Sequence, residues 1–339
     1  MYYSIQHHTK FQYSEPVSET IMEVRLCPRT EWTQHCMSFE IEVTPRVRVF
    51  EYRDHLGNTV HHFNVPNRHS DLAITTNSLV EVQPFLTWPD SVAPSAWEEI
   101  DQIVARDDYW EMLMPSHYAQ PSPRLVELAA KLHVVRRDDP MTVLRQINTG
   151  IYESFQYLPL STRVDSPIDD ALRNGKGVCQ DFAHIMITLV RQLRIPCRYV
   201  SGYVAPKEFG GEGQARARAG EASHAWVEAM LPGLGWVGFD PTNNRTVGDR
   251  HIRCAVGRDY FDVPPTKGLF RGAAAEEMTV HVNVQPVDGP QKPDAAFPYA
   301  VKEAGGNGGT PAGRPAQASR APMQVFDTIR QQQQQQQQQ

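Results

Sequence analysis

The sequence lacks the features of a membrane or exported protein. No apolar stretch approaches the ~20 residues that a membrane-spanning helix needs. The opening residues, MYYSIQHHTKFQYSE, lack the charged start and apolar block of a signal peptide. Basic residues are a minority, with 33 Lys and Arg against 39 Asp and Glu and a net charge of −6. We therefore expect a cytoplasmic protein that binds neither membranes nor nucleic acid as its main partner.

Cysteine is also scarce, and its spacing excludes two common uses. The chain has five cysteines without a CxxC pair: Cys27, Cys36, Cys179, Cys197 and Cys254. An odd, scattered set is a poor disulfide framework and a poor zinc site. A dense Asp/Asn/Gly series typical of a calcium loop is missing too. We expect reduced thiols, no metal and no cofactor.

The length of 339 residues suggests about two domains. Residues 1–90 contain about seven short runs that alternate apolar and polar positions, with LGN in DHLGNTVHHFNVP as a plausible hairpin tip. This pattern predicts an antiparallel β-sandwich. Residues 286–339 are rich in Pro, Gly and Ala and end in poly-Gln, which predicts a disordered tail.

Residues 91–285 mix helical and strand signals and form the second predicted domain, which makes the fold class α+β. Ser122 and Asp139 each precede a proline and a helical pattern, so both are expected N-caps. Residues 179–194 place apolar side chains every three to four positions, typical of a buried helix. The segment CRYVSGYV, then HAWVEAML and WVGFDPT around a PGLG turn, predict an antiparallel sheet.

The stretch GVCQDFAH places Cys179 at the start of this helix. The unpaired N–H groups and the dipole of a helix start favour a thiolate there. The N–H of Cys179 is also available to a developing oxyanion. We expect Gly177, which has no side chain, to let a substrate approach the backbone closely.

Two further stretches supply an imidazole and a carboxylate. SHAWVEA places His224 at the start of a strand, and WVGFDPT places Asp240 at the end of the next one. If Leu231 lies near Trp236, then His224 lies opposite Asn243 and Asp240 opposite about Val227, so the two side chains are diagonal neighbours. An imidazole that takes a thiol proton, oriented by a carboxylate, is the arrangement that nucleophilic catalysis by cysteine requires.

At these residues the sequence resembles the transglutaminase-like superfamily, in particular the bacterial proteins described as cysteine proteases. GVCQDFAH, RYVSGYV, SHAWVE and GWVGFDPTNN carry the resemblance, and the opening strands resemble the β-rich N-terminal domain of the same group. The resemblance implies a papain-like core with the cysteine helix packed on an antiparallel sheet. It also implies Cys179 as nucleophile, His224 as base and Asp240 as the orienting acid.

Several points stay open at this stage. We expect hydrolysis of an amide, peptide or isopeptide bond in a protein or peptide substrate. Transfer of the acyl group to an amine, or a non-catalytic binding module, is an alternative.

Oxyanion candidates are Tyr157 and Gln156, and pocket candidates are Trp226 and Trp236. His184 lies about 140° further around the helix than Cys179, so we expect a structural role for it. Residues 205–222 are either a lid or an ordinary surface loop. The edge strands of the sandwich leave a homo-oligomer open.

Overall fold

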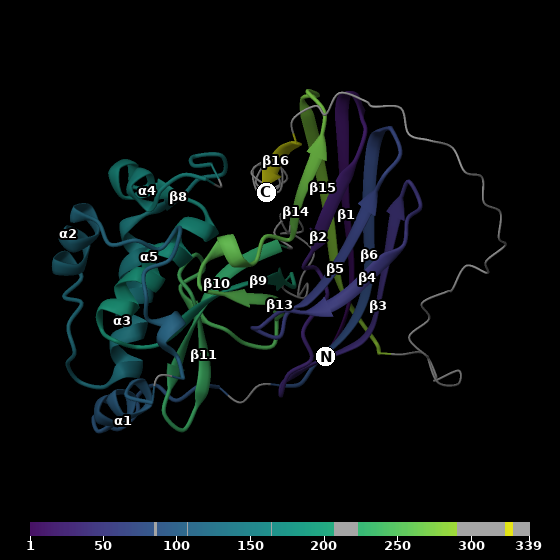
Figure 1. Cartoon of the computed structure of the whole chain (residues 1–339). Coiled ribbons are helices and arrows are strands. Elements are labelled where there is room, and N and C mark those ends of the chain that lie inside the picture. The colour runs from purple at the N-terminus through teal and green to yellow at the C-terminus, as the bar shows by residue number, and fades with distance from the viewer. Residues whose placement is uncertain (85–86, 107, 164, 207–222, 290–322, 328–339) are drawn as a thin grey trace, which may run out of the picture.

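A computed structural model describes residues 1–339 apart from 85–86, 107, 164, 207–222, 290–322 and 328–339. It consists of three layers (Figure 1): a group of helices, a five-stranded sheet in the middle and a β-sandwich on the other side. This confirms the predicted α+β class. Among the described residues, no helix is long and apolar enough to cross a membrane.

The β-sandwich begins with six strands: β1 (Tyr2–Val17), β2 (Thr20–Val24), β3 (Gln34–Thr44), β4 (Val49–Arg53), β5 (Thr59–Val65) and β6 (His69–Val82). Its sheets have the orders β15-β1-β6-β3 and β16-β14-β2-β5-β4. Alternate side chains of β1 and β6 are buried, which is the period-2 pattern of strands with one face against a core. The LGN segment lies in the turn between β4 and β5, as predicted.

The sandwich is completed by strands from the far end of the described chain, which were predicted to lie in the second domain or in the tail. These strands are β14 (Thr266–Arg271), β15 (Glu276–Val287) and β16 (Met323–Asp327). β15 pairs with β1 so that Phe11 faces Met278, and both side chains are buried in the sandwich core. The predicted boundary of the catalytic core at residue 285 is therefore wrong. Pairing of β1 with β15 buries apolar side chains that either strand alone would expose.

The predicted disordered tail, residues 286–339, falls largely outside the described residues. Within its described part, β15 continues to Val287, and residues 323–327 form β16 against β14. The prediction is wrong for these two segments.

The other part of the described chain forms a second lobe next to the sandwich. In this lobe, helices pack on one face of a sheet with the order β12-β11-β10-β9-β13. Its helices are α1 (Ala96–Val104), α2 (Pro123–Lys131), α3 (Pro140–Ser154), α4 (Ile168–Asn174) and α5 (Cys179–Gln192), with 3₁₀ turns at Trp110–Met112 and Tyr260–Asp262. Its strands are β7 (Gln156–Tyr157), β8 (Lys176–Gly177), β9 (Cys197–Val204), β10 (Ser223–Leu231), β11 (Gly235–Asp240), β12 (Arg245–Thr246) and β13 (His251–Gly257).

Local capping sets where these helices begin, as the sequence predicts. The Ser122 side chain accepts the N–H of Leu125 at the start of α2. The Asp139 side chain accepts the N–H of Thr142 at the start of α3. In both helices proline occupies the first turn, where its missing N–H costs no hydrogen bond. α4 ends at Gly175, whose φ of 63° is left-handed.

The two faces of the central sheet have different partners. Side chains of β10 that alternate from Ala225 to Leu231 pack in one hydrophobic core with α5. Trp226, on the opposite face, packs with Val200, Val247 and Val256, and Leu56 from the β4–β5 turn packs against this cluster. The sandwich therefore covers the face of the sheet that the helices leave open.

A buried ion network lies on the same face as Trp226. Glu228 is fully buried and accepts hydrogen bonds from Arg198 and Arg253. Burial opposes the ionised carboxylate, but the two arginine charges outweigh it and lower the pKa of Glu228 to about 2. Arg253 donates its backbone N–H to the side chain of Gln34, which joins this network to the sandwich.

Candidate functional site

The site begins at the first residue of α5. Cys179 opens the helix after Val178, which is extended, and Cys179 is 8% exposed. Asp181, in the first turn, accepts the backbone N–H of Val178 at 2.8 Å and the hydroxyl of Thr162 at 2.5 Å. Burial raises the pKa of Asp181 to about 6, although both hydrogen bonds oppose this shift. The carboxyl group of Asp181 therefore holds the backbone just before the helix, next to Cys179.

Gly177 lets the start of α5 pack closely, while its predicted role in substrate approach stays a prediction. A Cβ atom built on Gly177 would lie 2.9 Å from Cε1 of Phe182 and 3.0 Å from Oδ2 of Asp181. Real Cβ atoms essentially never show such a contact with a carbon. The glycine lets α5 and the Asp181 hydrogen bonds pack against the preceding backbone.

The hairpin of β10 and β11 positions the side chains of His224 and Asp240. Leu231 pairs with Gly235 and Val227 with Phe239, so the predicted register, with Asp240 opposite Val227, is wrong by one residue. Continuing the observed register places Asp240 opposite Trp226. A shift of one residue moves a side chain to the other face of a sheet. The observed register therefore puts Asp240 on the same face as His224, where the two can meet.

His224 contacts both Asp240 and Cys179. Its Nε2 lies 3.0 Å from Oδ2 of Asp240, and the His224 side chain also makes a hydrogen bond to the side chain of Cys179. The side chain of His224 is 8% exposed and that of Asp240 is fully buried. Burial disfavours the imidazolium ion, but the Asp240 charge and the hydrogen bonds to Asp240 and Cys179 outweigh it and raise the pKa of His224 to about 10. The structure thus brings the three predicted residues into one chain of contacts.

Asp240 is held by more donors than sequence reasoning identified. Its Oδ1 accepts the N–H groups of Thr242 and Asn243 at 3.1 and 3.2 Å. Its Oδ2 accepts the Asn243 side-chain amide at 2.7 Å and lies 3.2 Å from Nε2 of His251. Burial opposes the charged carboxylate, yet the two histidines lower the pKa of Asp240 below its usual range.

The sequence carries a local signal for only one of the two missed residues. Asn243 follows Asp240 by three positions in FDPTNN, which is the spacing of a turn closed by an Asx side chain. His251 begins β13, eleven positions after Asp240, and nothing nearby in the sequence singles it out.

The two oxyanion candidates lie beside the start of α5. β7, which contains both residues, pairs in parallel with β8, and Leu158 donates its N–H to the carbonyl of Gly177 at 3.0 Å. The Tyr157 ring lies edge-on to Phe182 with centroids 6.4 Å apart, and Gln156 is exposed. The backbone next to Cys179 is therefore held by this segment, and an oxyanion role for Tyr157 or Gln156 stays a prediction.

The structure contradicts a pocket role for Trp226. Trp226 is fully buried, stacks with His224 at 6.3 Å between ring centroids and lies edge-on to His251 at 5.2 Å. It therefore supports the two histidines from inside the protein and lines no accessible wall. Trp236 lies at the far end of β11 from Asp240, where Arg198 lies 4.3 Å from its ring centroid. A pocket role for Trp236 stays a prediction.

The remaining predictions concern His184, the loop 205–222 and metal binding. His184 is buried, stacks on Tyr118 and accepts the N–H of Tyr260 through Nε2, which confirms a structural role. Burial lowers the pKa of His184 to about 4. The loop 205–222 lies almost wholly outside the described residues. Within the described part of the chain, no group of three or more His, Cys, Asp or Glu side chains is placed to hold a metal.

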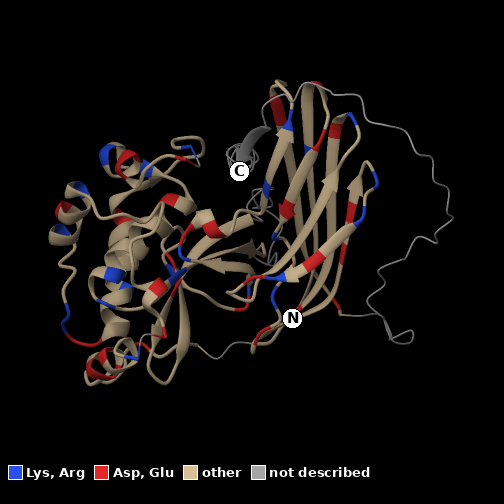
Figure 2. Cartoon of the chain, viewed as in Figure 1, with Lys and Arg blue, Asp and Glu red and all other residues tan. Residues whose placement is uncertain are grey.

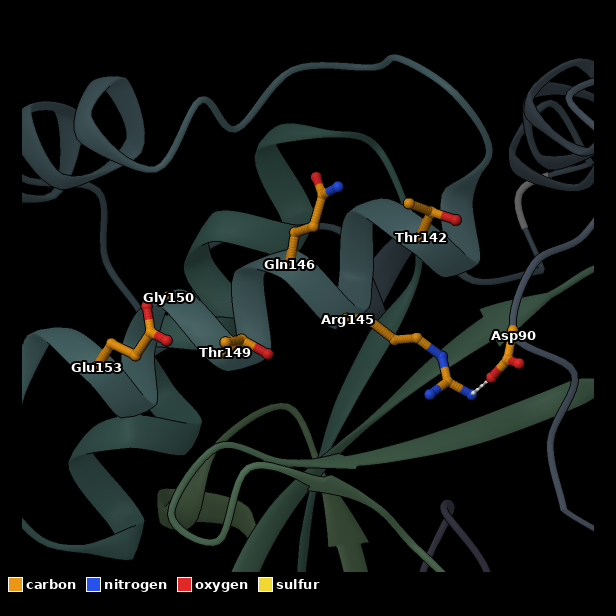
Figure 3. A pocket seen from close by; sticks show the side chains of 7 residues that line it. All are labelled: Asp90, Thr142, Arg145, Gln146, Thr149, Gly150 and Glu153. Atoms are coloured by element: carbon orange, nitrogen blue, oxygen red, sulfur yellow. Dashed lines mark ion pairs between the residues drawn. The ribbon is translucent and has the colours of Figure 1, made fainter.

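A groove with a volume of 340 Å³ runs along the exposed side of α3 (Figure 3). The side chains around it are polar, and Arg145 pairs with Asp90 across it at 3.7 Å. Thr149, at its edge, donates its hydroxyl to the side chain of Asn244 at 2.9 Å. Asn244 is the next residue after Asn243, so the groove borders the turn that holds Asp240. Cys179 is not among the residues that line it.

Two protein-family models match this chain. Residues 3–81 match the bacterial transglutaminase-like N-terminal region, and residues 128–241 match the transglutaminase-like superfamily. The second range contains Cys179, His224 and Asp240. It ends before Asn243 and His251.

Similar proteins cover most of the chain. An uncharacterized protein of Mycobacterium leprae is 32% identical over 280 residues, which is 83% of this chain and 97% of that protein. An uncharacterized protein of Mycobacterium tuberculosis is 30% identical over 299 residues, 85% of this chain and 93% of that protein. A protein-glutamine gamma-glutamyltransferase of Pseudomonas aeruginosa is 28% identical over 178 residues, 51% of this chain and 25% of that protein.

The fold resembles that of a solved structure. A Cytophaga hutchinsonii protein described as a candidate cysteine protease superposes with a TM-score of 0.64 and 22% identity, over 85% of this chain and 92% of that one. At this identity the likeness concerns the arrangement of strands and helices.

Proposed function

Because the chain belongs to the transglutaminase-like superfamily, we propose that it is a thiol enzyme that cleaves amide bonds through Cys179, His224 and Asp240. The observation that carries this proposal is the run of contacts from Cys179 through His224 to Asp240. A purely structural cysteine at a helix start needs neither a buried imidazole nor a carboxylate behind it. The proposed substrate is a protein or peptide, and a cytoplasmic location is part of the proposal.

The proposed first step forms a thioester. The Cys179 sulfur, with its proton on His224, attacks the carbonyl carbon, and the electron pair of the C=O bond moves to oxygen. The N–H of Cys179 stands at the first helical position, where a backbone N–H has no intrahelical acceptor, so it is placed to stabilise that oxyanion. His224 then gives its proton to the departing amine as the C–N bond breaks.

The proposed second step releases the acid. His224 takes a proton from water, the resulting hydroxide attacks the thioester carbon, and the C–S bond breaks. The sulfur leaves as thiolate beside the protonated His224, which is the starting state of the first step. Asp240 keeps the imidazole oriented and stabilises its cation in both steps.

Transfer to an amine is the second candidate. It shares the first step and differs only in that a primary amine attacks the thioester in place of water. The similarity to a protein-glutamine gamma-glutamyltransferase over 51% of this chain supports it. Charged residues of both signs are interspersed over both lobes (Figure 2). This distribution favours neither water nor an amine as the acceptor of the acyl group.

The test of a thiol enzyme needs no substrate. Alkylation by iodoacetamide would be followed against pH for the wild type and His224→Ala, with each of the five thiols quantified by mass spectrometry. We expect Cys179 to react fastest, well below the pH of ~8.5 at which an ordinary thiol ionises, and to lose this advantage in His224→Ala. His35→Ala removes an exposed histidine and is the matched control. Slow labelling of Cys179 that ignores His224 would overturn the proposal.

The two candidate outcomes are separated by product mass. Glutamine-containing peptides would be incubated with the protein and a fluorescent primary amine. Hydrolysis converts an amide to an acid, whereas transfer attaches the fluorescent amine to the peptide. Both products should vanish with Cys179→Ala. Peptides left unchanged while the alkylation test succeeds would mean that these peptides are not substrates.

A further inference from the structure

Two histidines meet on one oxygen atom of Asp240. Nε2 of His224 lies 3.0 Å and Nε2 of His251 lies 3.2 Å from Oδ2 of Asp240. The two rings are 6.5 Å apart, and Trp226 contacts both of them. The chemistry proposed above uses only His224, so His251 needs a separate explanation.

The hydrogen bonds of His251 identify its tautomer. The backbone N–H of Gly248 donates to Nδ1 of His251 at 3.4 Å, so Nδ1 is the acceptor nitrogen. The proton of the neutral ring therefore lies on Nε2, which donates it to Asp240. Burial lowers the pKa of His251 despite the nearby carboxylate, and the residue is 3% exposed. His251 thus gives Asp240 a hydrogen bond without adding a second positive charge.

The fold brings His251 to this position from across the sheet. β13, which begins with His251, pairs with β9, whereas Asp240 ends β11, with β10 between β11 and β9. Gly202 on β9 is opposite His224 and has no side chain. A Cβ there would lie 2.7 Å from Cη2 of Trp226 and 2.1 Å from the carbonyl oxygen of Ile252. The missing side chain lets β13 and the Trp226 ring approach closely beside both histidines.

We propose that His251 is a positioning residue of this site, a neutral donor that shares Oδ2 of Asp240 with His224. The inference rests on the proposed function. By occupying part of Oδ2, His251 holds the carboxylate in place while His224 gains and loses its proton. It also withdraws negative charge from Asp240, which limits how tightly His224 retains that proton.

The charged groups around His251 set the sign of the effect. Asp240 on β11 attracts a proton, while His224 on β10 and Arg245 on β12 disfavour a charge on His251. Without the His251 donor, the Asp240 carboxylate acts on His224 with less competition. His224 should then keep its proton to higher pH, so the pKa of its imidazole in the folded chain should rise.

The test compares substitutions that keep or remove the donor. NMR would follow the titration of the His224 imidazole, through its ring C–H resonances, from neutral to strongly alkaline pH in the wild type, His251→Phe and His251→Gln. Phe keeps a ring of similar size without a donor, whereas the Gln amide nitrogen takes the place of Nε2. We expect the pKa of His224 to rise by about one unit in His251→Phe, a tenfold change in the His224 equilibrium. It should stay near the wild-type value in His251→Gln.

Each outcome has a definite meaning. A pKa of His224 that is equal in all three proteins would overturn the positioning role, even where His251→Phe lowers the melting temperature, because a purely structural histidine affects stability alone. If His251→Phe does not fold, His251→Asn replaces it, since its amide sits nearer the position of Nδ1. A wild type whose Cys179 shows no dependence on His224 would instead refute the proposed function itself.

Discussion

The side chain of Asn58 makes two hydrogen bonds to the backbone of Val256. Its Nδ2 donates to the carbonyl of Val256 and its Oδ1 accepts the N–H of Val256, both at 2.8 Å. Asn58 lies in the β4–β5 turn of the sandwich and is fully buried, whereas Val256 belongs to β13 of the central sheet. The turn therefore acts like one more strand residue on the edge of the sheet that carries His224. This makes the sandwich part of the support of the site.

Asn58→Ala should destabilise the whole chain. It leaves the N–H and C=O of Val256 buried without these partners, which costs about 2–4 kcal/mol for two such groups. Urea unfolding measures the change, and Asn64→Ala, at an exposed asparagine of β5, is the matched control. A loss no greater in Asn58→Ala than in Asn64→Ala would show that the turn does not support the sheet.

Asn243 should matter for reactivity more than for stability. Its side-chain amide donates to Oδ2 of Asp240 at 2.7 Å from an exposed residue of the turn. Asn243→Ala removes one donor, and we expect Cys179 alkylation to slow by roughly threefold to tenfold, the equivalent of about 1 kcal/mol. Asn243→Asp should slow it further, because a second carboxylate beside Asp240 adds a repelling charge. Equal rates in the wild type and both variants would contradict this role.

The His224–Asp240 pair should make stability depend on alkaline pH. The pKa of His224 is raised to about 10 in the folded chain, above the ordinary value of 6.5, through Asp240 and Cys179 and despite burial. Its contribution is therefore complete below pH 6.5 and is lost as pH rises through about 10. We expect the stability advantage of the wild type over His224→Gln to shrink by about 2 kcal/mol or more across this range.

Urea unfolding of both proteins at neutral and at alkaline pH measures that change. Groups that do not contact His224 titrate alike in both proteins and cancel in the difference. An advantage that is constant with pH would mean that His224 is not a cation in the folded state.

The contribution of Asp181 to stability should change with pH in the opposite direction to that of an ordinary paired carboxylate. Burial raises its pKa to about 6 from 3.8, so the folded chain binds its proton more tightly than the unfolded chain does. Its contribution is complete below pH 3.8 and falls by about 3 kcal/mol as pH rises through 6. Asp181→Asn should remove this slope while the amide oxygen still accepts the N–H of Val178.

The measurement is the free energy of unfolding of the wild type and Asp181→Asn on either side of pH 6. Asp169→Asn, in the first turn of α4, serves as the control. Parallel pH profiles for the wild type and Asp181→Asn would show that the Asp181 carboxyl is ionised throughout.

Much of this architecture follows from short-range patterns in the sequence. Ser122 and Asp139 cap their helices because a cap needs only its own side chain and the N–H three residues later. The start of α5 at Cys179 and the hairpin tip at LGN are likewise local. These signals place a cysteine at a helix start and a histidine and an aspartate on neighbouring strands before any tertiary contact is considered.

Only the tertiary structure decides how those pieces meet. The one-residue register of β10 against β11 selects the face of Asp240, and that register depends on the turn and on packing against α5. β15 pairs with β1, from which it is separated by most of the sequence, because the apolar faces of the two strands together cover the sandwich core. His251 reaches Asp240 across the sheet, and Asn58 reaches β13 from the other lobe. Such contacts depend on where distant segments fold, since a buried polar group takes whichever partner the packing brings within reach.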